Sequence, residues 1–195
     1  MSLNTPAHLV LNLAILGRLA PERERVAGWI VSGALLPDLP MFAFFVWQRW
    51  VRGATQSEIW DVAYFEPGWQ HLFDAFNSVP IFAALGLIAL AMRRSGPAWL
   101  CASVLLHALG DAFLHREDGH RHLWPLSPWR FESPVSYWDP THHGNLGAGF
   151  ETVVVLMSTA VLWKDAPRSG RIALAFLSAV SLGGWAAFYG LGYAP

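Results

Sequence analysis

The sequence has little that would support a disulfide-bonded, nucleic-acid-binding or soluble protein. It contains one cysteine, Cys101, which excludes an internal disulfide and a metal site built from thiolates. Only 14% of its 195 residues are charged and the net charge is -1, so we expect no basic surface for nucleic acid. The chain is instead rich in apolar sequence, with 54% hydrophobic residues. This length and composition predict one membrane-embedded domain over residues 1–195.

The apolar sequence falls into about five to six segments, which predict an all-α, polytopic membrane helix bundle. The first segment, 6–17, rises only about 18 Å and cannot cross a hydrocarbon core of about 30 Å, so we expect it to be re-entrant or to end inside the bundle. The second, 26–50, contains P-D-L-P at 37–40, and two prolines so close together predict a broken helix with freed carbonyls. The later segments are 71–92, 97–115, 149–163 and 171–193, and outer loops are predicted at 51–70 and 116–148.

The basic residues predict the orientation of this bundle. Eight of the thirteen lysines and arginines lie in three short loops, which the positive-inside rule assigns to the cytoplasm. All eight histidines then fall in the outer loops or in the outward halves of helices. We therefore expect a histidine-rich site that faces the outer side of the membrane. The eight basic residues are Arg18, Arg23, Arg25, Arg93, Arg94, Lys164, Arg168 and Arg171.

The strongest chemical motif is L-H-A-L-G-D-A-F-L-H at 106–115, which places His107, Asp111 and His115 on one face of a helix. A carboxylate between two imidazoles is costly in an apolar segment unless something binds it. Histidine and carboxylate ligands without cysteine suit zinc, with manganese and iron as weaker alternatives, and several of each suit more than one ion. The competing interpretation is a network of hydrogen bonds between packed helices.

Four short motifs, in this order, resemble those of a known family. They are His8 near the start, G-A-L-L-P-D-L-P at 33–40, H-x-x-x-D at 107–111 and L-W-P-L-S-P-W-R-F at 123–131. Over these residues the chain resembles the YdjM-like family of predicted membrane-bound metal-dependent hydrolases. That family is distantly similar to the zinc-dependent phospholipase C and single-strand nuclease superfamily. The resemblance implies a helical inner-membrane protein with two or three zinc ions and a phosphoester substrate.

The resemblance also implies roles for particular residues. Asp38 would be the bridging carboxylate that acts on the attacking water. Two positions depart from the pattern, because Asn77-Ser78 replaces a His-Ser pair and Glu151 follows His143 by eight residues instead of four. The implied metal ligands are His8, Asp38, His71, His107 with Asp111, His115 or His120, and His142 or His143 with Glu151.

Other polar residues have interpretations of their own. Asp74 is expected to assist catalysis as a hydrogen-bond partner of His71. His120 and His122 are interpreted as solvated loop residues, and Asp139 as a turn residue. The candidates for holding an anionic head group are Arg116, Arg121 and Arg130.

Together these features predict a membrane-bound metal-dependent hydrolase of a phosphate ester, lipid-linked, at the outer side of the membrane. A membrane lipid or lipid-linked phosphate is the expected partner, and nucleic acid is not. The second interpretation is a non-enzymatic membrane subunit with a structural metal or a histidine-ligated haem. A metal transporter is the third, and the lack of histidine near the cytoplasmic side counts against a path through the membrane.

Overall fold

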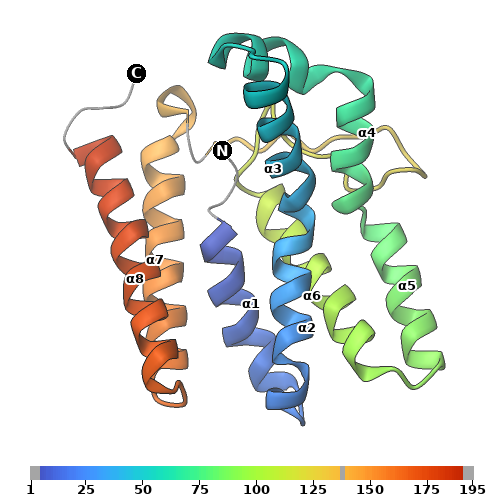
Figure 1. Cartoon of the computed structure of the whole chain (residues 1–195), viewed down its shortest axis with the longest axis vertical. Coiled ribbons are helices and arrows are strands. Elements are labelled where there is room, and N and C mark those ends of the chain that lie inside the picture. The colour runs from blue at the N-terminus through green and yellow to red at the C-terminus, as the bar shows by residue number, and fades with distance from the viewer. Residues whose placement is uncertain (1–4, 137–138, 191–195) are drawn as a thin grey trace.

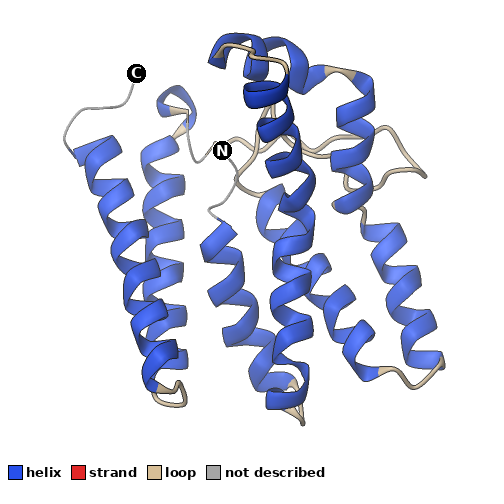
Figure 2. Cartoon of the chain, in the orientation of Figure 1, coloured by secondary structure: helices blue, strands red, loops and turns tan. Residues whose placement is uncertain are grey.

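The protein is a bundle of helices that run roughly along one axis (Figure 1). The computed structural model describes residues 5–136 and 139–190, and every regular element in these ranges is helical (Figure 2). The expectation of an all-α fold is therefore confirmed for the described residues. The main helices are α1 (Thr5–Leu19), α2 (Arg23–Leu35), α3 (Leu39–Val46), α4 (Pro67–Phe76), α5 (Val79–Ala91), α6 (Ser95–Ala112), α7 (Gly144–Trp163) and α8 (Arg168–Trp185).

Three stretches of the described chain are long and apolar enough to cross a membrane. They are Arg23–Val51, which includes α2 and α3, Pro67–Ala91, which joins α4 and α5, and Gly144–Trp163, which is α7. We expected five to six membrane segments. The structure supports a helix bundle with three candidate membrane spans among the described residues. Large apolar side chains are exposed on α5, α7 and α8, as expected for helices that face lipid. They include Leu87, Leu90, Phe150, Met157, Ile172 and Phe176.

The second helix is not broken at P-D-L-P, so this prediction is wrong. α2 passes into a 3-10 turn, Leu36–Asp38, and then directly into α3, with helical dihedral angles at Leu35, Asp38 and Leu39. Pro37 lacks an N–H, and the backbone responds by tightening into a 3-10 turn. One carbonyl in the last turn of α2, that of Ala34, does accept a hydrogen bond from a side chain, as described below.

The two predicted outer loops differ in structure. Residues 51–70 are mostly helical, with a π-turn at Glu58–Val62 and a 3-10 turn at Ala63–Phe65 before α4, so the loop prediction is wrong there. The described residues between α6 and Asp139 are irregular, as predicted. Aromatic packing explains the order of the first stretch, because the ring of Phe44 contacts those of Trp60, Tyr64, Trp69 and Phe73.

α1 lies at the centre of the bundle and packs against α2, α6 and α7. It begins well below the upper ends of α3 and α7, so that His8 is fully buried (Figure 1). This agrees with the expectation that the first segment ends inside the bundle. A buried polar contact fastens it, because Asn12 Nδ2 donates to O and Oγ of Ser103 at 2.8 and 2.9 Å. Ser103 Oγ in turn donates to Ile30 O on α2 at 2.6 Å.

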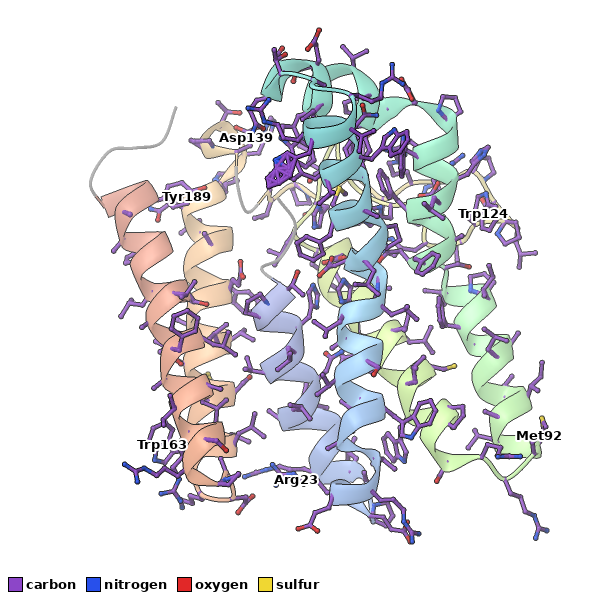
Figure 3. The ribbon with its side chains drawn as sticks, in the orientation of Figure 1. Arg23, Met92, Trp124, Asp139, Trp163 and Tyr189 are labelled. Carbon is purple, nitrogen blue, oxygen red and sulfur yellow. The ribbon has the colours of Figure 1, made fainter. Side chains whose placement is uncertain are left out.

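The three basic loops lie at the same end of the bundle. Figure 3 shows Arg23, Met92 and Trp163 at the lower end, and Asp139 at the upper end. At the lower end Arg23 Nη1 lies 2.8 Å from Asp165 Oδ2, which ties α2 to the turn between α7 and α8. The basic loops identified in the sequence therefore lie together at one end of the bundle.

The close approach of α2 to α6 gives the first testable prediction. A Cβ on Gly33 would lie 2.3 Å from Leu100 O and 2.7 Å from Ser103 Cβ, so Gly33→Ala must push the helices apart. We expect it to lower the free energy of unfolding by about 1–3 kcal/mol, measured by thermal unfolding in detergent. Gly28→Ala on the same helix is the control, because nothing lies within 4 Å of its added Cβ. Equal unfolding temperatures for the two variants would contradict the packing.

Candidate metal centre

Asp111 is a buried carboxylate in the last turns of α6, and two imidazoles reach it from different helices. His8 Nε2 on α1 lies 2.8 Å from Asp111 Oδ1, and His107 Nε2, one turn earlier on α6, lies 3.1 Å from Oδ2. All three side chains are at most 1% exposed. Their ligand atoms lie within 4.8 Å of one another, and no other group of three possible metal ligands meets this limit in the described ranges.

The two imidazoles have a defined orientation. The rings of His8 and His107 stack with their centroids 3.5 Å apart and 11° between their planes. His107 Nδ1 lies 2.8 Å from the carbonyl oxygen of Ala34 and must donate to it, so Nε2 of the neutral ring carries the lone pair. His107 Nε2 and Asp111 Oδ2 are both buried and lack a hydrogen bond of good geometry. This arrangement is suited to a cation placed between them.

Asp38 approaches the same group from the 3-10 turn between α2 and α3. Its Oδ1 lies 3.6 Å from His107 Nε2, and its Oδ2 accepts a hydrogen bond from Thr5 Oγ1 at 2.6 Å. The residue is only 5% exposed. The turn at P-D-L-P therefore places a second carboxylate beside the cluster, and Thr5 at the start of α1 orients it.

His115 follows the end of α6 and connects the cluster to the long loop. Its Nδ1 lies 2.8 Å from Asp118 Oδ2, while its Nε2 faces Asp111 Oδ1 at 3.7 Å. Burial alone would raise the pKa of Asp118, but the neighbouring His115 imidazole lowers it to about 2. An ionised carboxylate on the far ring nitrogen orients an imidazole and raises its basicity. Asp111 thus has three imidazole Nε2 atoms around it.

Asp74 fastens the loop to α4, and its expected pairing with His71 is wrong. Its buried carboxylate accepts from the backbone N–H of Arg121 at 2.8 Å and also pairs with the Arg121 guanidinium. The N–H of Val79 donates to His122 O at 2.9 Å. These contacts hold the loop against the junction of α4 and α5.

The loop carries two histidines that the sequence interpretation left in solvent. His120 is 5% exposed and His122 is half-buried, so the solvated interpretation is wrong for His120. Burial lowers the pKa of His120 to about 4 and lowers that of His122, and the Asp111 carboxylate opposes both shifts. Both rings therefore lie within electrostatic reach of the cluster. The sequence feature that could have indicated a shared position for His120 and His122 is their i, i+2 spacing in H-R-H, because this spacing puts two side chains on one side of an extended segment.

Three of the predicted ligands lie outside the buried group of His8, His107 and Asp111. His71 is exposed beside Trp124, with ring centroids 6.3 Å apart. His142 pairs with Asp139 at 2.6 Å in the turn before α7, which agrees with the turn role expected for Asp139, and His143 is exposed at the N-terminus of α7. A fourth predicted ligand, Glu151, is buried on α7, the helix that packs against α1.

The three arginines expected to hold an anionic head group make contacts within the protein. These contacts attach parts of the loop to one another or to α4. They pair Arg121 with Asp74, Arg130 Nη2 with Gln70 Oε1 at 2.8 Å, and Arg116 Nε with Glu117 Oε1 at 3.0 Å.

A cavity of about 530 Å³ lies beside the cluster. His115 and His120 line it, so His115 is shared between the cavity and the surroundings of Asp111. No lysine or arginine belongs to its lining in the described part of the chain. The other lining residues are the apolar or aromatic Met41, Trp60, Tyr64 and Phe65 and the acidic Asp61, Glu117, Asp118 and Asp139.

Comparison with known proteins gives one positive finding. No curated protein and no solved structure matches the chain. A family model, described as YdjM inner membrane protein, matches residues 5–191. The match extends beyond the four sequence motifs through α7 and α8. The chain therefore belongs to the YdjM family of inner membrane proteins.

Proposed function

We propose that this chain is a membrane-bound, metal-dependent hydrolase of a lipid or lipid-linked phosphate ester, acting at the outer side of the membrane. The observation that carries the proposal is the buried group of His8, His107 and Asp111, which His115 connects to a cavity. The lone pair of His107 Nε2, which faces the Asp111 carboxylate, is unfavourable alone in an apolar bundle and would be favourable around a divalent cation. Membership of an inner-membrane protein family supports the membrane location.

The donor set fits zinc. Zinc binds histidine nitrogen and carboxylate oxygen at about 2.0–2.2 Å in a tetrahedron, so neighbouring ligand atoms lie about 3.4 Å apart. The His8 and His107 Nε2 atoms lie 2.8 and 3.1 Å from the oxygens of Asp111, and small movements would open such a position. Asp38 Oδ1, 3.6 Å from His107 Nε2, would complete it. Manganese or iron could use the same donors.

A second or third ion would need ligands beyond this group. His115 Nε2 lies 3.7 Å from Asp111 Oδ1, and the charge of Asp111 also acts on the imidazoles of His120 and His122. We propose His115 and His122 for a second ion in preference to His142, which is paired with Asp139, and His143, which is exposed. Asp111 would then be the carboxylate that these histidines share with His8 and His107.

A bound ion would lower the pKa of a water molecule and stabilise charge on the phosphoryl oxygens. Asp38 would orient that water and accept its proton, because Thr5 holds one carboxylate oxygen and the other faces His107 Nε2. Ala34 O keeps the His107 ring in one tautomer and one orientation. The burial of these groups lowers the local dielectric constant, which strengthens their effect on developing charge.

Complete burial of the cluster also supports a second candidate, a structural metal in a non-enzymatic membrane subunit. His8 and His107 are fully buried. A metal site that no substrate can reach can stabilise the fold without taking part in catalysis. The alternative of a haem held by His8 and His107 does not suit their parallel stacking, because the two axial histidines of a haem lie on opposite sides of the iron.

Hydrolysis in proteoliposomes tests the proposal. We expect zinc-loaded protein to cleave a phospholipid or prenyl phosphate, and expect chelation to stop and zinc to restore the reaction. Asp38→Asn keeps the size of the side chain but weakens its basicity, so it should lower the rate by a factor of about 10² or more. Asp165→Asn, at the opposite end of the bundle, should keep the wild-type rate.

Two results would contradict this account. A near wild-type rate for Asp38→Asn on the identified substrate would remove Asp38 as the base. A metal-loaded protein that cleaves no phosphoester would favour the structural-metal candidate.

The outward orientation rests on the positive charge at one end of the bundle and has its own test. In a Cys101→Ala background, which removes the buried native thiol, cysteines would replace Ser95 at the basic end and Leu126 in the long loop. Both positions are exposed, Leu126 by 79%. We expect an impermeant maleimide to label Leu126→Cys in intact cells and Ser95→Cys only after lysis. The reverse pattern would place the site on the cytoplasmic side.

A further inference from the structure

The cavity beside the candidate metal centre has an excess of negative charge. Its lining includes four carboxylates and no lysine or arginine among the described residues. Aspartate and glutamate side chains in contact with water carry a negative charge at neutral pH. One of them, Glu117, is paired with an arginine, and the contacts of the other three include a hydroxyl group and two imidazoles. These contacts are Asp61 with Ser57 Oγ at 2.7 Å, Asp118 with His115 at 2.8 Å and Asp139 with His142 at 2.6 Å.

Aromatic rings form the other part of the lining. Trp60 and Tyr64 use their polar atoms elsewhere, because Trp60 Nε1 donates to Gln56 Oε1 at 2.9 Å and Tyr64 Oη donates to Asp118 O at 2.9 Å. Neighbouring rings, those of Phe44, Phe45 and Phe73, cover part of both side chains, so what remains for a ligand is the part of each ring that lines the cavity. Aromatic rings attract organic cations through their quadrupole, by about 0.5–2 kcal/mol for each favourable contact.

His120 gives an independent indication that the cavity takes a ligand. It lines the cavity, is only 5% exposed, and makes no hydrogen bond to any residue in the described ranges. A buried polar side chain without a partner is costly, and a bound molecule with a donor group would remove that cost. The ring thus offers a hydrogen-bond acceptor inside the cavity.

We propose that this cavity binds an alkylammonium group, and that this group is the head group of the substrate. The assignment to a substrate rests on the proposed function, whereas binding of the cation itself requires no hydrolysis. His115 lines the cavity and faces Asp111 at 3.7 Å, so a phosphoester attached to the bound cation would lie next to the candidate metal centre. An anionic head group would instead meet four carboxylates, with no lysine or arginine among the described lining residues to hold it.

Calorimetric titration in neutral detergent tests the proposal with choline as the probe. Its neutral isostere, 3,3-dimethylbutan-1-ol, and inorganic phosphate are the comparisons, all at one ionic strength. We expect choline to bind at least about tenfold more tightly than the isostere, and more weakly as salt is added. Equal binding of choline and its isostere, absence of saturable choline binding, or preference for phosphate would each overturn the proposal.

Variants locate the binding to the cavity. Asp61→Asn removes a lining carboxylate and Trp60→Leu removes an aromatic ring, and each should weaken choline binding about three- to tenfold. Glu66→Gln is the matched control, because Glu66 is an exposed acid nearby that does not line the cavity and does not cap α4 with its side chain. If Glu66→Gln weakens binding as much as Asp61→Asn, the choline site lies elsewhere.

A chelated sample separates this proposal from the proposed function. Choline should still bind after metal removal, because the cavity acids and rings are parts of the chain itself. Hydrolysis of a phosphoester without selectivity for an ammonium head group would leave the proposed function intact and overturn this inference. Choline binding by a protein that cleaves no phosphoester would support the cation site but reject its role in a substrate.

Discussion

A carboxylate buried in an apolar helix bundle is the constraint on which the rest of this structure depends. Asp111 would be strongly unfavourable there without partners. The fold supplies them from separate elements, with His8 from α1, His107 from α6 and His115 from the beginning of the long loop. The same requirement explains why α1 is short and central, because its N-terminal end has to reach the depth of Asp111.

The two ends of the bundle have opposite chemical character, and the cluster belongs to the end without the basic loops. At the basic end an exposed ion pair, Arg23 with Asp165, connects α2 to the turn between α7 and α8. At the other end the buried Asp74 pairs with the half-buried Arg121 and holds a loop whose residues line an acidic and aromatic cavity. The two ends of the bundle can therefore be told apart chemically. The proposed site requires such a difference, because it would take its substrate from one side of the membrane.

Helical spacing was enough to predict that His107 and Asp111 lie side by side in the candidate site, because they are one turn apart on the same helix. The long loop could not be predicted, since its path depends on Asp74 and Arg121, which are 47 residues apart in the sequence. That pairing brings His120 toward Asp111. It also occupies Arg121, which the sequence analysis had proposed as a residue that binds an anionic head group. The prolines around Asp38 were correctly singled out, but the sequence did not reveal that a 3-10 turn would keep the helix continuous.

The metal content of the purified protein tests the central claim most directly. After loading with zinc and dialysis against metal-free buffer, the wild type should retain about one equivalent or more, because the ligands of His8, His107 and Asp111 already converge. His107→Ala should lower that content, whereas His71→Ala, which removes an exposed histidine, should leave it unchanged. A wild type that retains much less than one equivalent, or equal losses in the two variants, would contradict the account and leave Asp111 in a hydrogen-bonded network without a metal.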